Sequence, residues 1–78
     1  MKRIYQITAG NGQDFYETNA RDAVSLGKEF AETFGKDTVF IDYVEIESKI
    51  LNESDLSLKE LYQDISEDSK KINAYKSF

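Results

Sequence analysis

The chain has 78 residues, of which 40% are hydrophobic, ten are basic and fifteen are acidic, so the formal net charge is −5. This length suits one domain around one hydrophobic core, and the absence of cysteine excludes disulfides, thiolate nucleophiles and cysteine zinc sites. Histidine is also absent, which removes the usual general base near neutral pH and the commonest transition-metal ligand. No stretch approaches the roughly 20 apolar residues of a membrane span. We therefore expect a single cytoplasmic domain, residues 1–78, that is not an enzyme and needs no metal or other cofactor.

An alternating pattern near the start of the chain predicts a β-hairpin. Tyr5 and Ile7 alternate with polar residues, which is typical of a strand with one buried face. Residues 10–12, Gly-Asn-Gly, supply the positive φ angles that a tight turn requires. The strand predicted over residues 2–9 is therefore followed by an antiparallel strand over residues 14–18.

The next segment has the spacing of an amphipathic helix. Asn19 can cap its start, and apolar residues then recur every three or four positions as far as Phe34, just before Gly35. Gly27 lies within the apolar stripe, where it costs up to about 1 kcal/mol relative to alanine. We explain this glycine by a close approach of the helix to the sheet.

Residues 38–47 are rich in β-branched and aromatic side chains, which predicts a third strand. Apolar residues occupy both alternating sets of positions, since Ile41 belongs to one set and Val44 to the other. Two explanations fit this pattern. Either the strand is buried on both faces, or a bulge near Tyr43 and Val44 shifts the register.

A capping box predicts a second helix that begins after Ser57, because Glu60 follows the cap by three positions. Residues 66–78 have a weaker pattern, which fits a helix, an extra edge strand or a loosely ordered tail. The element order ββαβα indicates an α+β fold. We expect a small antiparallel sheet of about three strands with one or two helices packed on one face.

The acids are concentrated in the second half of the chain. Residues 37–68 contain ten acids and two lysines, whereas residues 1–36 contain five acids and five bases. Such a segment attracts a basic protein surface and repels nucleic acid and anionic membranes. Tyrosines in the same segment suit an interface, because the ring gives a large rigid contact area and a polar tip. The predicted partner-binding residues are Asp42, Tyr43, Glu45, Glu47, Glu53, Asp55, Glu60, Tyr62 and Asp64.

Two resemblances indicate what this segment could do. Glu47-Ser48-Lys49, with Asp37 or Asp42 upstream, resembles in outline the acid-then-Glu-x-Lys core of a large nuclease superfamily. That resemblance implies two carboxylates that hold Mg²⁺ and a lysine that assists the attacking water. In size, acidity and lack of cysteine, the chain is also similar to phage and mobile-element inhibitors of nucleic-acid enzymes, including anti-CRISPR proteins. This second similarity implies that carboxylates stand in for phosphates in a basic groove of a nuclease or another nucleic-acid-binding protein.

We favour the small acidic protein-binding module, an inhibitor of this kind, over the alternatives. The minor alternative is the metal-dependent nuclease-like domain. Another is an accessory or regulatory subunit, or a homodimeric structural protein, that pairs through an exposed edge strand or through residues 72–78. In a further alternative, the acids only solubilise the surface and have no partner.

Overall fold

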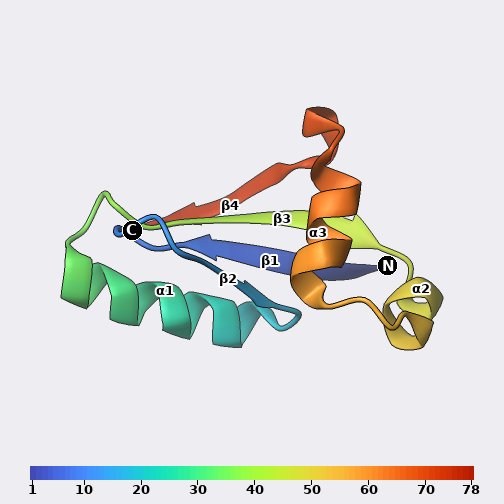
Figure 1. Cartoon of the computed structure of the whole chain (residues 1–78). Helices are drawn as coiled ribbons and strands as arrows, with labels where there is room; N and C mark the ends of the chain where they lie inside the picture. Colours follow the sequence, from blue (N-terminus) through green and yellow to red (C-terminus); the bar gives the residue numbers. More distant parts are fainter.

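The chain folds into a four-stranded antiparallel sheet with two main helices packed against it, in a computed structural model that describes residues 1–78 (Figure 1). A short third helix and a 3₁₀ turn complete the secondary structure. In chain order the elements are β1 (Lys2–Thr8), β2 (Asp14–Glu17), α1 (Ala20–Phe34), β3 (Phe40–Ile46), α2 (Ser48–Glu53), α3 (Leu58–Ser66), η1 (Ser69–Lys71) and β4 (Asn73–Ser77).

The strand order across the sheet is β2-β1-β3-β4, so that β1 and β3 are central and β2 and β4 are the edges. Tyr5 on β1 lies opposite Glu17 on one side and opposite Tyr43 on the other. The predicted α+β class and the hairpin are confirmed. The end of the chain, for which the sequence left three structures open, forms the edge strand β4.

Local signals in the sequence explain where the first elements begin and end. The Gly12 N–H donates to the Ala9 carbonyl at 3.0 Å, and Gly12 has φ +86°, a conformation that glycine adopts without strain. The Asn19 side chain accepts hydrogen bonds from two backbone N–H groups in the first turn of α1. The helix ends at Gly35, which has φ +103°. The predicted bounds of α1 are therefore confirmed.

The two main helices contact opposite faces of the sheet. Ile4 and Tyr5 are neighbours on β1, so their side chains point to opposite faces, and both are buried. Tyr5 packs in a cluster with Ala23 of α1, whereas Ile4 packs in a cluster with Leu61 of α3. We name these surfaces the α1 face and the α3 face. The α1 cluster consists of Tyr5, Ile7, Ala23, Ala31, Val39 and Ile41, and the α3 cluster consists of Ile4, Val44, Ile46, Leu61 and Tyr62.

This arrangement corrects one detail of the predicted fold, in which the helices share one face. β3 buries Ile41 on the α1 face and Val44 on the α3 face, which agrees with the first of the two explanations for its pattern. The pairing of β3 with β1 is regular through Tyr43 and Val44. The register shift instead lies between β3 and β4, where Ile41 pairs with Lys76 and Asp42 with Ala74. A bulge near Tyr43 and Val44 is therefore not the cause of the imperfect alternation.

Gly27 lies at a close approach of α1 to the sheet, as its place in the apolar stripe predicted. A Cβ atom at this position would lie 2.6 Å from Cε2 of Phe78 and 3.2 Å from Cδ1 of Ile41. Real Cβ atoms do not approach other atoms as closely as the first of these distances. Glycine therefore makes room for the Phe78 ring between α1 and β3.

Candidate functional site

The structure does not bring the nine predicted partner-binding residues together on one surface. They fall into three groups, which differ in the face of the sheet and in burial. Asp42 and Tyr62 lie on the α3 face in partly or fully buried positions. Tyr43 and Glu45 lie on the α1 face. The remaining five belong to the segment of α2 and α3 and are exposed: Glu47, Glu53, Asp55, Glu60 and Asp64.

Asp42 and Tyr62 form part of the interior beneath α3. The Tyr62 ring lies 5.4 Å from the ring of Tyr16, and Gln6 Nε2 donates a hydrogen bond to Tyr16 Oη at 3.0 Å. The Tyr62 hydroxyl is buried without a hydrogen-bond partner. Burial, followed by the negative charge of Asp42 and smaller effects of its other neighbours, raises the pKa of Tyr62 to about 12. Tyr62 is thus a core residue, and its side chain is not accessible to a partner.

Burial also raises the pKa of the Asp42 carboxyl above its ordinary value, because the ionised form loses hydration beneath α3. A half-buried carboxylate of this kind is a weak contact for a protein partner. We therefore leave Asp42 and Tyr62 out of the candidate surface.

Tyr43 and Glu45 lie on the α1 face of β3, where Tyr43 packs against the α1 cluster and Glu45 is exposed. The Arg3 guanidinium carbon is 4.1 Å from the centre of the Tyr43 ring, a cation–π contact. Tyr5 and Tyr75 complete a group of three rings whose centres are 5.1 to 6.1 Å apart. Tyr5 belongs to the α1 cluster and Tyr43 packs against it, so Tyr43 has a structural role there.

The acids on and beside α2 and α3 hold the excess negative charge of the molecule. We define the acidic segment as residues 47–68. It contains seven acids and two lysines, so its net charge is −5, whereas the rest of the chain contains eight acids and eight bases. The whole net charge of the protein therefore belongs to this one segment.

The outer side of α3 presents its acids in a row. Leu58, Leu61 and Ile65 pack toward the sheet, in or against the α3 cluster, which leaves Glu60 and Asp64 on the opposite side of the helix. One helical turn separates the two carboxylates, a rise of about 6 Å along the axis. Packing on the inner side of α3 sets their position, and the Glu60 carboxylate also accepts a hydrogen bond from the Ser57 hydroxyl at 3.2 Å.

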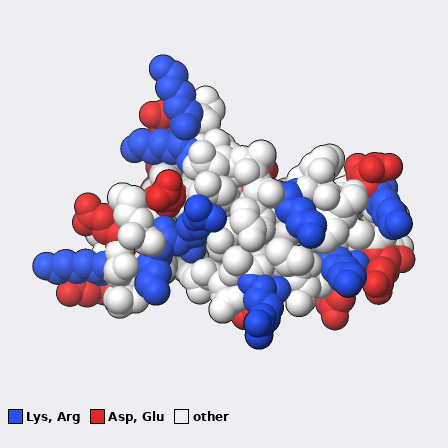
Figure 2. All heavy atoms as spheres, turned by 180° about the vertical axis from the view of Figure 1, so that it is seen from behind, with Lys and Arg blue, Asp and Glu red and all other residues white.

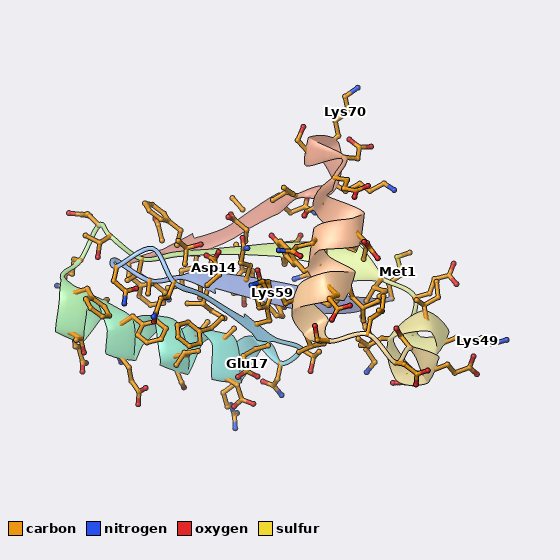
Figure 3. All side chains as sticks on the ribbon, viewed as in Figure 1. Met1, Asp14, Glu17, Lys49, Lys59 and Lys70 are labelled. Carbon is orange, nitrogen blue, oxygen red and sulfur yellow. The ribbon has the colours of Figure 1, made fainter.

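The two lysines of the acidic segment do not cover this row. Figure 3 shows Lys49 projecting outward from α2 at the end of the molecule, away from α3. Lys59 instead lines a shallow groove with Asp14 and neighbouring residues of the β1–β2 hairpin. The acidic character of the outer side of α3 is thus retained.

Exposed apolar side chains accompany the acids. Ile50 of α2 and Leu56 of the α2–α3 loop are 50% and 44% exposed. Ile50 also lines a groove of about 520 Å³ with Glu45, Glu47 and Ile65, and Lys70 and Lys71 contribute to its wall. Apolar contacts surrounded by charged groups are the composition expected of a protein-binding surface.

The residues that resemble a nuclease core do not share one strand. β3 ends at Ile46, and Ser48 begins α2, so that Lys49 is helical and Glu47 occupies the position before the helix. Asp42 lies on the strand beneath α3, apart from both. The structure contains no group of three or more carboxylates placed to hold a metal ion. This geometry gives no support to the metal-dependent alternative.

Sequence reasoning missed a group of lysines on the other end of the molecule. Lys28 and Lys36 line a groove with Lys76 of β4, although they are far from it in the sequence. Figure 2, which views the molecule from behind, shows Lys and Arg side chains spread across its width, with most of the acids toward the ends. The lack of acids in residues 69–78 was the only signal of this basic surface in the sequence.

Comparisons with protein-family models, with curated proteins and with solved structures found no match to this chain. None of its helices combines the length and the apolar composition needed to cross a membrane.

Proposed function

We propose that this chain is a protein-binding module without catalytic activity, and that its acidic segment contacts a basic surface of another protein. The observation that carries the proposal is that residues 47–68 hold the whole net charge of the chain. Charge concentrated in this way steers a basic partner and fixes its orientation. Direct binding of nucleic acid is disfavoured at this surface for the same reason.

In its finer form, the proposal identifies the partner surface as the groove in which a nuclease or another nucleic-acid-binding protein holds phosphates. The two carboxylates on α3, Glu60 and Asp64, would occupy phosphate positions there. Ile50 and Leu56 would add apolar contacts at the same end of the molecule, where burial excludes water and strengthens the charge pairs. Binding of this kind inhibits the partner by blocking its substrate.

The test measures binding of the immobilised protein to a panel of purified basic nucleases by biolayer interferometry, with and without duplex DNA. We expect at least one nuclease to bind, and duplex DNA to compete because it needs the same groove. The variant Asp55→Lys/Asp64→Lys should weaken binding by on the order of tenfold at low salt. Neither of the two carboxylates makes a hydrogen bond that the fold requires, so we expect the variant to stay folded.

The matched control is Glu29→Lys/Glu32→Lys, which changes the net charge by the same amount on the exposed side of α1. It should bind nearly as wild type does. Equal losses for the two variants would show that only total charge matters, and unchanged binding by Asp55→Lys/Asp64→Lys would contradict the proposal. Circular dichroism of both variants provides the check on folding.

A further inference from the structure

Edge strand β4 leaves one row of its backbone groups without a partner in the sheet. β4 is last in the order β2-β1-β3-β4, so it pairs on one side only. The Phe78 N–H donates to the Val39 carbonyl at 3.0 Å, which shows that the backbone groups of residue 78 point toward β3. The backbone groups of successive residues in a strand point to alternate sides. Ser77 therefore points its N–H and C=O groups toward the free edge. A further strand can therefore pair here.

A groove of about 360 Å³ runs beside this edge, between β4 and α1. Its apolar surface comes from the helix and from the Phe78 ring, and three lysines and one glutamate surround it. The residues that line it are Val24, Lys28, Ala31, Glu32, Lys36, Lys76 and Phe78. The groove thus combines an apolar floor with a positively charged rim.

We propose that an extended acidic segment of another protein binds at this edge as a fifth strand. Its backbone pairs with β4 at Ser77, an apolar side chain enters the groove beside Phe78, and its carboxylates lie near Lys28 and Lys76. The alternation of side chains along a strand places every second one toward the α1 face, where the groove lies. The acidic chemistry of the partner follows from the excess of lysine over glutamate around the groove.

A second copy of this chain fits the edge less well than an acidic partner. β4 contains one lysine, Lys76, and no acid, so the β4 strand of a second copy would bring no carboxylate to the lysines around the groove. Lysines on an edge strand commonly prevent such self-pairing. The α2 and α3 helices of a second copy, with Glu53, Glu60 and Asp64, cannot join a sheet as a strand, and its acidic edge strand β2 is only four residues long. This inference concerns a different surface from the acidic segment and does not depend on the function proposed for it.

The test uses a fluorescein-labelled peptide of alternating glutamate and valine as the probe, and fluorescence anisotropy at low salt as the measurement. We expect the wild-type protein to bind this probe, and to bind the matching lysine–valine peptide far more weakly. Lys28→Glu/Lys76→Glu should weaken binding by on the order of tenfold or more. The variant Asp55→Lys/Asp64→Lys should bind the probe at least as tightly as wild type, which separates this inference from the proposed function.

Strand pairing is tested by removing hydrogen bonds while the charge stays the same. Ser77→Pro deletes the outward N–H, and should weaken binding roughly three- to tenfold, whereas Ser77→Ala should have little effect. A probe with N-methyl groups on alternate amides removes the bonds from the ligand and leaves the protein unchanged. It should also bind more weakly.

Three results would overturn the proposal. Equal binding of the glutamate and lysine peptides would exclude an acidic partner. If Ser77→Pro and the methylated probe both bind as well as their controls, charge alone holds the peptide and no strand is added. A wild-type dimer in analytical ultracentrifugation that Ser77→Pro converts to monomer would assign the edge to a second copy of the chain.

Discussion

At the scale of single residues, Phe78 connects three parts of the fold. Its ring lies against Gly27 of α1 and near Ile41 of β3. Its N–H donates to Val39, and its carbonyl accepts a hydrogen bond from the N–H of Asp37. The absence of a side chain at Gly27 is therefore part of what holds β4 to the rest of the molecule.

Gly27→Leu should lower the free energy of unfolding by roughly 1–3 kcal/mol or more, because the new side chain would overlap the Phe78 ring. Urea denaturation followed by circular dichroism measures the loss. Phe78→Ala makes room for the leucine, so the double variant should lose less than the sum of the two single variants. Additive losses would mean that the two side chains do not compete for the same space.

Tyr62 is the second residue with a distinct energetic role, because its buried hydroxyl has no hydrogen-bond partner. The pKa of Tyr62 is about 12 in the folded protein, above the ordinary tyrosine value of about 10. The folded state therefore retains this proton at pH values where the unfolded state releases it. Stability from this group is fully present below about pH 10 and is lost as the pH rises toward about 12.

Tyr62→Phe should remove that loss. We expect the free energy of unfolding of wild type to fall more steeply between pH 10 and pH 12 than that of Tyr62→Phe, with a difference in slope of up to about 1.4 kcal/mol per pH unit. Near pH 7 the variant should be as stable as wild type or slightly more stable, because no hydrogen bond is lost. Parallel pH profiles from urea denaturation would contradict this account of Tyr62.

At the scale of elements, the strength of the local pattern decided what the sequence could predict. The hairpin, α1 and the capped start of α3 were predictable because turn glycines, cap residues and apolar spacing act over a few positions. α2 was missed because it has only six residues and no side chain that caps it. β4 could be no more than one of three alternatives, since its pairing with β3 joins residues 73–77 to residues thirty or more positions earlier.

The candidate site was only partly predictable for the same reason. Its residues were chosen as near neighbours in the sequence, but Asp42 and Tyr43 are on opposite faces of β3. Side chains alternate between the two faces along a strand, and this rule could have separated the two residues. The acids that follow β3 were predictable as an exposed group, because α3 has one apolar side and one polar side. The lysines around Phe78 could not be grouped from sequence, because the fold alone brings α1 beside β4.

Ser57 tests how much the start of α3 depends on its cap. The Ser57 hydroxyl accepts from the Glu60 N–H at 3.3 Å and donates to the Glu60 carboxylate at 3.2 Å. Ser57→Ala should cost about 1 kcal/mol, or a fall of about 4 to 8 °C in melting temperature. Ser57→Asp should stay close to wild type, because aspartate also caps helices and suits the helix N-terminus. If Ser57→Ala melts at the same temperature as Ser57→Asp, the cap does not stabilise α3.

At the scale of the whole molecule, the acidic segment and the lysine groove lie toward opposite ends of the longest axis. The molecule measures 36 × 22 × 18 Å, with α1 at one end and α2 and α3 at the other (Figure 1). The Debye length in physiological salt is about 8 Å, which is much shorter than the molecule. The acidic segment and the lysine groove can therefore act on different partners without cancelling each other.

Divalent metals should leave the whole molecule unaffected. We expect Mg²⁺, Mn²⁺ or Ca²⁺ at millimolar concentration to change the melting temperature very little, because no set of carboxylates is placed to bind them. A metal at 100 times its dissociation constant would add about 2.7 kcal/mol of stability. A saturable rise in melting temperature with one metal, abolished by Glu47→Gln, would revive the metal-dependent alternative. Differential scanning fluorimetry is sufficient for this measurement.

The division of the core between two faces of one sheet has a consequence for the order of folding. The α1 cluster joins residues between Tyr5 and Ile41, whereas the α3 cluster must bring Ile4 to Leu61 and Tyr62. Closing the shorter loops costs less chain entropy, so we expect the hairpin, α1 and β3 to assemble first and α3 to join later. In stopped-flow chevron measurements, Ala23→Gly should therefore mainly slow folding, and Leu61→Ala should mainly speed unfolding. The α3 helix with its acids would then be the last element to form and the first to unfold.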